Sequence, residues 1–535
     1  MTSSGEALPQ TYYDTVEPYL RHGNKPGDRQ YLADILQSWS PEIDTNNDIG
    51  WALHYAIFQG NHAAVQMIID AGASPSLRDR QDPGLTPLLA ASQYGRLQMA
   101  QLFWERIGPE GRLMPSKRRK SSPTCLQIAA RNNHADITAY FLGVWDGWGD
   151  EDKYLALQDA ASAWCDDTAA VLLADLEGQY GPDTIQDALE KAVGSRMILP
   201  EHETKPDPNA TDMARQQKLV IRLIDAGADP DSNSARLNQP LLIHRASASP
   251  DRIGALKGLL DKGANPNRVD SQGKTALHHV FHSFKRGNAE DVALKTLLQH
   301  GALVEVVDEN GETPLHVVAQ VASCEQLKLC LSHCDASEAE GTRLQNIHGE
   351  TLLHYAAVGG QRDTVEFLLD FGLDVNVSNT NGWTPLLCSL ALVVGKKTSE
   401  MCETASFLLQ HGAAPTVVTD EGWTPLHALA SWPVAHDSTV RSDVAILAER
   451  LISGGAPMGL KSKVIRSPST TWKMLSDVWG FRLGDFVKNA AVNVRDLGQA
   501  DSTTPLMWAR RSKATDVVDV IAAHVARQLD CHLLA

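Results

Sequence analysis

Apolar residues recur along this chain in short, paired segments with helical spacing, and glycines punctuate the pairs. In residues 349–381 a first apolar segment covers Leu353–Val358, and Gly359-Gly360 then interrupts it. A second apolar stripe follows within Thr364–Asp370, and Gly372 ends it. This pattern predicts two short amphipathic helices joined by a turn, followed by an extended connection to the next pair.

The pattern returns with a period near 33 residues, which indicates a repeat architecture. Each unit is expected to open at its equivalent of the tetrapeptide Thr-Pro-Leu-His. In that tetrapeptide Thr can cap the helix and Pro occupies the first helical position. The predicted openings are Trp51, Thr86, Thr124, Leu155, Asp187, Leu241, Thr275, Thr313, Thr351, Thr384, Thr424 and Thr504.

This helix-turn-helix unit with an extended finger resembles the ankyrin repeat family, most closely between Leu241 and Ala456. The resemblance implies an all-α fold, an ankyrin-repeat solenoid of stacked helix-turn-helix units with short β-hairpin fingers. It also implies a surface of fingers and first helices that binds other proteins. Neither helix of a unit can bury its apolar face alone, so each unit must stack on its neighbours.

The regularity of the repeat predicts five segments. Residues 1–49 read as N-terminal capping helices or a degenerate repeat, and 50–144 as ankyrin repeats. Residues 145–239 read as degenerate repeats with a polar, Pro-rich loop at 197–212, and 240–459 as regular repeats. Residues 460–535 read as a degenerate repeat, with helices at 471–479 and 482–489, and a C-terminal capping repeat.

Composition narrows the functional classes. The net charge of −17 disfavours direct binding of nucleic acid, which requires cationic side chains. No apolar run reaches the roughly 18 residues needed to span a bilayer, and the N-terminus lacks the pattern of a signal peptide. The eight scattered cysteines fit reduced thiols, so we expect a cytoplasmic or nuclear protein that is not secreted.

Candidate chemistry is sparse, and we expect no catalytic residue, cofactor or metal. Histidine occupies the fourth tetrapeptide position in six units, which favours a hydrogen-bonding network between adjacent fingers over a metal site. The group Cys324, Cys330, His333 and Cys334 lacks the two separated ligand pairs usual for zinc. The six histidines are His54, His244, His278, His316, His354 and His427.

One dense basic run, Lys117, Arg118, Arg119 and Lys120, has two interpretations. It is either a nuclear import signal or a solvated loop, because short basic runs are common on loops.

A partner-binding site is hypothesised on the fingers of the regular repeats. Trp51, Trp383 and Trp423 share one position after the finger glycine, where they are either exposed anchors for a partner or packed against the adjacent finger. Acidic residues near the finger tips would favour a basic partner segment. The hypothesised site consists of Asp308, Glu309, Trp383, Asp420, Glu421 and Trp423.

The favoured function is non-catalytic binding of partner proteins, as an intracellular scaffold, adaptor or regulator. One alternative is a nuclear transcription co-regulator or, from the resemblance to fungal arrays, an accessory protein of a secondary-metabolite gene cluster. A second alternative is an enzyme with its site in the irregular region 145–212.

Overall fold

The computed structural model covers the chain in two compact units. Unit 1 comprises residues 1–246 and 251–264, and unit 2 comprises residues 247–250 and 265–535. The described residues are 20, 30, 32–34, 36–37, 48–79, 82, 84–107, 123–175, 182–194, 210–232, 241–281, 288–334, 341–390, 398–420, 422–430, 432, 438–463, 502–512 and 514–534.

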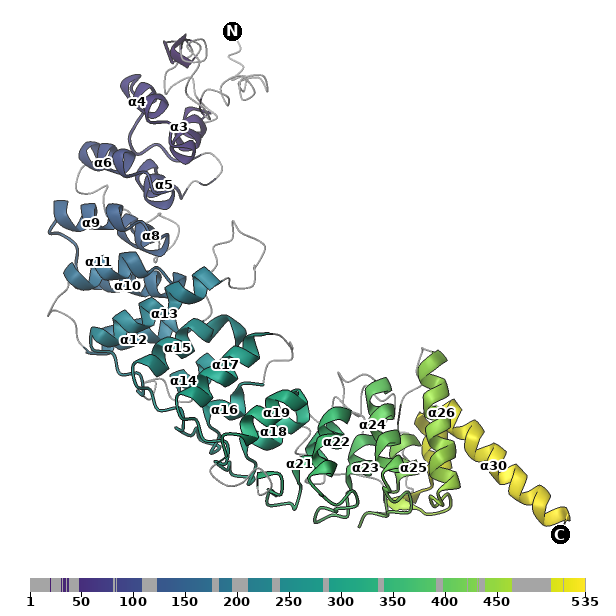
Figure 1. The fold of residues 1–535 in the computed structure, drawn as a ribbon. Helices are drawn as coiled ribbons and strands as arrows, with labels where there is room; N and C mark the ends of the chain where they lie inside the picture. Colours follow the sequence, from purple (N-terminus) through teal and green to yellow (C-terminus); the bar gives the residue numbers. More distant parts are fainter. Residues whose placement is uncertain are drawn as a thin grey trace, which may run out of the picture. The chain divides into compact units, whose positions relative to one another are not determined.

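Unit 1 is a stack of antiparallel helix pairs (Figure 1). The first helix of a pair packs on its own second helix and on the first helix of the next pair, as α5 does with α6 and α8. The helices are α3 (Asp48–Gln59), α4 (His62–Asp70), α5 (Pro87–Gln93), α6 (Leu97–Arg106), α8 (Cys125–Arg131), α9 (Ala135–Val144), α10 (Asp150–Ala163), α11 (Asp166–Asp175), α12 (Pro182–Ala192), α13 (Ala210–Asp225), α14 (Leu242–Ser247), the 3₁₀ turn η1 (Pro250–Arg252) and α15 (Ile253–Asp261).

Unit 2 repeats the same arrangement, and its finger strands are very short. Strands β1 (Ser462–Lys463) and β2 (Ser502–Thr503) pair antiparallel. The helices are α16 (Ala276–His279), α17 (Asn288–Gln299), α18 (Pro314–Val321), α19 (Cys324–Leu331), α21 (Leu352–Val358), α22 (Arg362–Asp370), α23 (Pro385–Leu390), α24 (Thr398–Gln410), α25 (Pro425–Ala430), α26 (Ser438–Ser453), α29 (Pro505–Ser512) and α30 (Thr515–Leu534).

The core of unit 2 follows the predicted stripes. Every residue of α21 is buried, and α21 packs between α18 and α23. On α22 the buried residues include Val365 and Leu368, as the sequence predicts. The approach of α21 to α18 requires glycine at position 359, because a Cβ there would lie 1.9 Å from the Gln320 carbonyl oxygen. Stacking of neighbouring pairs therefore creates the core that one pair alone lacks.

Three predicted openings are wrong, since Trp51, Leu155 and Asp187 lie inside α3, α10 and α12. In these three pairs the tetrapeptide does not begin with Thr-Pro, so no capping residue there marks the start of the helix. Helix α10 instead begins after Gly149, whose backbone N–H donates to the Asp152 carboxylate at 3.2 Å. Helix α12 begins at Pro182, where the missing N–H costs nothing.

Two further boundaries differ from the prediction. Helix α13 begins at Ala210, so the last three residues of the predicted loop 197–212 belong to this helix instead. Helix α25 packs against α29 and α26 against α30, so these two pairs are direct neighbours. The degenerate repeat predicted with helices at 471–479 and 482–489 lies outside the described residues. No helix within the described ranges is long and apolar enough to cross a membrane.

Candidate binding surface

The fingers of unit 2 are built from a recurring tight turn. In the finger 308–312 the Asp308 N–H donates to the Glu312 carbonyl at 2.9 Å. The Asp308 side chain closes the turn, because its Oδ1 accepts from the backbone N–H groups of Asn310 (2.8 Å) and Glu312 (2.9 Å). Gly311 has φ +72°, a conformation that glycine adopts at little cost.

Four other fingers of unit 2 close with the same backbone hydrogen bond between the first and fifth residue of the turn. They are 270–274, 346–350, 379–383 and 419–423. Adjacent fingers are joined by one backbone hydrogen bond each. The donor and acceptor pairs are Glu309 to Gln272, Ile347 to Asn310, Thr380 to His348 and Asp420 to Asn381, at 2.9–3.2 Å. The five fingers thus form one hydrogen-bonded row, here called the finger row.

Two of the tetrapeptide histidines, His278 and His354, bridge adjacent fingers of this row, as the sequence predicts. His354 Nδ1 lies 3.1 Å from the Thr351 backbone N, which donates to it, and its Nε2–H donates to the Trp383 carbonyl of the next finger at 3.1 Å. His278 makes the same bridge to the Glu312 carbonyl at 3.2 Å. Burial lowers the pKa of His278, His316 and His354 to about 4. These imidazoles are therefore neutral structural groups at neutral pH.

The structure contradicts the interpretation of Trp383 and Trp423 as exposed anchors. Their side chains are 1% and 3% exposed. The Trp383 backbone N–H donates to the Asn379 side chain at 2.9 Å, and its carbonyl accepts from the Asn379 N–H and from His354. Both tryptophans are therefore buried parts of their fingers. Trp51 lies in α3, where it stacks on Tyr55 with ring centroids 5.2 Å apart.

The acidic candidates divide into two groups. Asp308 is buried, contrary to the expectation of an exposed charge, because its carboxylate closes the turn. Glu309 and Asp420 are exposed at equivalent tip positions of two fingers. Glu421 and the basic run Lys117, Arg118, Arg119 and Lys120 lie outside the described residues.

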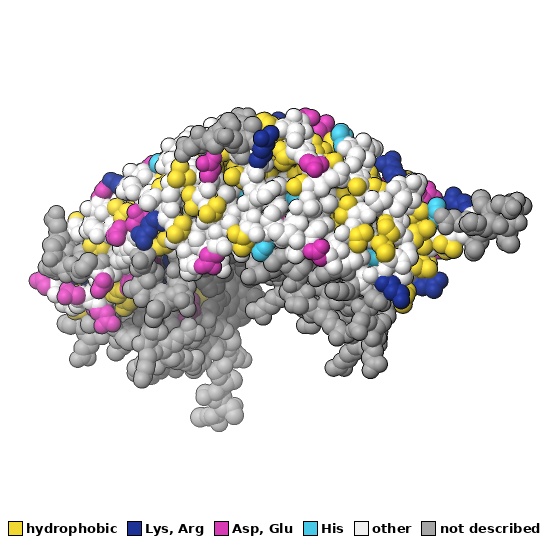
Figure 2. Space-filling model, turned by 90° about the horizontal axis from the view of Figure 1, so that it is seen from below, with side chains coloured by type: hydrophobic (Ala, Val, Ile, Leu, Met, Phe, Trp, Pro, Cys, Tyr) yellow, Lys and Arg dark blue, Asp and Glu magenta, His cyan; other side chains and the backbone are white. Residues whose placement is uncertain are grey.

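Sequence reasoning missed a set of exposed aliphatic side chains on the finger row. Val307, directly before the finger 308–312, is 57% exposed, and Ile347, in the next finger, is 63% exposed. Val269 and Val418 share the position of Val307 relative to their own fingers and are also exposed. Their apolar character suggested burial, and only the period of the finger could have identified them. On the face shown in Figure 2, apolar side chains are interspersed with scattered acidic and basic ones.

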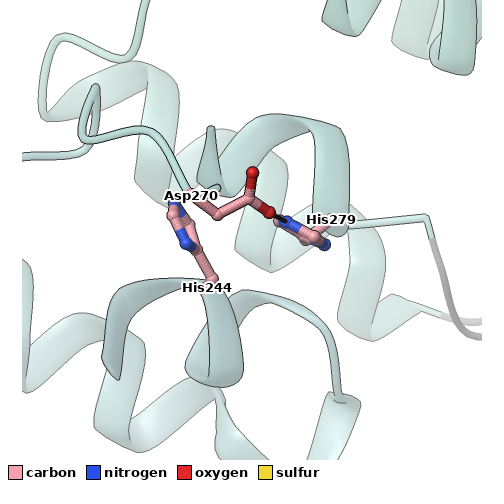
Figure 3. A group of neighbouring side chains, drawn as sticks. All are labelled: His244, Asp270 and His279. Atoms are coloured by element: carbon pink, nitrogen blue, oxygen red, sulfur yellow. Dashed lines mark hydrogen bonds and ion pairs between the residues drawn. The ribbon is translucent and has the colours of Figure 1, made fainter. Parts of the chain in front are cut away.

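Two side chains of a type that can bind metal, Asp270 and His279, are paired in unit 2. His279 Nε2 lies 2.9 Å from Asp270 Oδ2 (Figure 3), and Asp270 Oδ1 accepts from the backbone N–H groups of Gln272 and Lys274. Burial alone would raise the pKa of Asp270, but the hydrogen bonds from His279, Lys274 and Gln272 outweigh burial, so the pKa lies below its ordinary value. His244, also labelled in Figure 3, belongs to unit 1.

Several thiols are buried in the helix pairs. Burial raises the pKa of Cys125, Cys330 and Cys402 to about 12 and that of Cys388 well above its ordinary value. These cysteines act as small hydrophobic residues in the core.

Stacked helix pairs whose fingers form a hydrogen-bonded row define a helical repeat protein. Comparison with known proteins agrees with this class. A family model described as ankyrin repeats (3 copies) matches residues 53–143, 243–336, 282–379 and 317–398. Over these residues the chain consists of ankyrin repeats. Its repeats indicate a protein–protein interaction domain, a class that is typically non-catalytic.

A human protein, ankyrin repeat and SOCS box protein 6, is 37% identical over 71 residues. The match covers 13% of this chain and 17% of the human protein. It therefore concerns a small part of each protein and not the human protein as a whole.

Proposed function

We propose that the protein binds partner proteins without catalysis, as a scaffold, adaptor or regulator, and that the finger row of unit 2 is the binding surface. The observation that carries this proposal is the exposure of Val307, directly before one finger, and of Ile347 in the next finger, because a backbone hydrogen bond joins these two fingers. Exposed aliphatic side chains on a rigid row offer apolar area that a partner can cover at little cost in ordering.

The chemistry of the row supports an extended partner segment that carries both aliphatic and basic side chains. Glu309 lies beside the aliphatic positions, and Asp420 is its equivalent further along the row. Complementary charge of this kind increases the rate of encounter and helps to fix the register of the partner.

Partner capture with matched surface variants tests the proposal. Partners are recovered from a cell extract with the purified chain and identified by mass spectrometry, and the strongest one is then titrated in purified form. Val307→Ser with Ile347→Ser should weaken binding by more than about fivefold, the effect of losing a hot spot of over 1 kcal/mol.

The control variant is Ile446→Ser on α26, which removes an aliphatic side chain that is 45% exposed and lies away from the fingers. It should bind as the parent does. If the double variant and the control bind equally well, the finger row is not the binding surface.

A further inference from the structure

A carboxyl group lies buried within the finger row. The Glu312 side chain is 4% exposed and accepts one hydrogen bond among the described residues, from the Tyr355 hydroxyl at 2.7 Å. Tyr355 belongs to α21 of the next repeat and is fully buried. The carboxyl group of one finger is therefore held by the first helix of its neighbour.

The same hydroxyl connects this carboxyl group to two more fingers. Asn346 Nδ2 donates to the Tyr355 oxygen at 3.2 Å and to Glu350 Oε2 at 2.8 Å. Asn379 Nδ2 donates to Glu350 Oε1 at 3.0 Å. A buried network thus runs through the fingers 308–312, 346–350 and 379–383. Because Glu350 receives two amide donors, its charge is compensated far better than that of Glu312.

The charged groups that face Glu312 are mostly of its own sign. Asp308, on the same finger, has a buried Oδ2 without a hydrogen-bond partner, and Glu350 approaches from the next finger. Lys274, on the preceding finger, is the cation that acts on Glu312. Together these surroundings raise the pKa of Glu312 to about 7. Burial is the largest cause, the Tyr355 hydrogen bond and Lys274 oppose it, and the Asp308 and Glu350 charges add to it.

We propose that the Glu312 carboxyl group is a proton-binding site that couples three consecutive fingers to pH. In its protonated form the group can remain in the buried network without charge repulsion. In its ionised form it places a third negative charge beside Asp308 and Glu350, and this weakens the packing of the central fingers. As a consequence that rests on the proposed function, a cationic partner side chain would favour release of this proton.

The direction of the effect on stability follows from proton linkage. Glu312 has a folded pKa of about 7 and an ordinary value of 4.5, so the folded state binds the extra proton between these pH values. The stabilising contribution is fully present below pH 4.5 and is lost as the pH rises through 7. The buried histidines act in the opposite direction in part of this range, so a comparison of variants is required.

The experiment titrates the full-length protein without any partner. Carbon-13 NMR of protein labelled at the glutamate carboxyl carbon should show one group that titrates near pH 7. That signal should be absent in Glu312→Gln and present in Glu309→Gln, the exposed control on the same finger. Tyr355→Phe removes a bond that favours the ionised form, so it should raise the titration midpoint.

Denaturant unfolding provides a second readout. The folding constant of Glu312→Gln relative to that of the parent should rise by tens of fold between pH 5 and pH 7.5. For Glu309→Gln that ratio should stay constant. The proposal is overturned if no glutamate titrates between pH 6 and 8, or if the signal there survives in Glu312→Gln. Neither measurement uses a partner, so loss of the proposed binding function would leave this result unaffected.

Discussion

Replacement of Trp383 separates a structural role from a binding role. Trp383→Ala removes a large side chain that is 1% exposed. A buried aromatic side chain covers about 200 Å², so burial at about 25 cal/mol/Å² amounts to about 5 kcal/mol. Comparable truncations cost roughly 3–5 kcal/mol, because the surroundings relax only partly. We expect a loss of about 4 kcal/mol from the repeats around α23.

The assay is urea unfolding followed by far-ultraviolet circular dichroism. Repeat arrays can unfold in stages, so the parent curve must first show which transition belongs to unit 2. Val307→Ala is the control, since truncation of an exposed side chain should cost less than about 0.5 kcal/mol. A shift for Trp383→Ala no larger than that of the control would show that the tryptophan does not hold the finger.

Three further predictions concern the same repeats. Asn376→Ala should lower the free energy of unfolding in urea by about 1–2 kcal/mol. The Asn376 side chain donates a hydrogen bond to the Gly412 carbonyl (3.1 Å) and accepts one from the Ala414 N–H (2.8 Å) of the next repeat. An unchanged unfolding midpoint would contradict this prediction. Leu353→Asp should cost several kcal/mol by burying an unpaired charge, and retention of parental stability would mean that the predicted core face is wrong. The three buried histidines have folded pKa values of about 4 against an ordinary 6.5, so the unfolded state binds more protons between these pH values. Stability should therefore fall as the pH drops below 6.5, by up to about 1.4 kcal/mol per pH unit for each histidine, and a His316→Gln variant should show a shallower acid limb in pH-dependent unfolding.

The regular repeats were predictable because their signals are local. Helices α18, α23 and α25 begin directly after Thr313, Thr384 and Thr424, where the Thr-Pro dipeptide defines the start. Helix α10 starts with a different cap, so the repeat period alone placed its opening five residues too late, at Leu155.

The side of the finger that a residue faces was not predictable in the same way. Trp383 and Ile347 are both apolar and both lie on a finger, yet the first is buried and the second exposed. Which side packs inward is decided by contacts with the neighbouring repeat, and those contacts are not local in sequence. The hypothesised site therefore retained Glu309 and Asp420 on the surface but misplaced Asp308 and both tryptophans.

The buried cysteines allow the opening of individual repeats to be measured. Thiols react with alkylating reagents as thiolates, so a buried thiol with a pKa of about 12 reacts only when its helix pair opens to water. Cys125 lies in α8, Cys330 in α19 and Cys388 in α23, so each reports on a different repeat. The alkylation rate of each cysteine, measured on its own peptide, therefore reports how often that repeat opens locally.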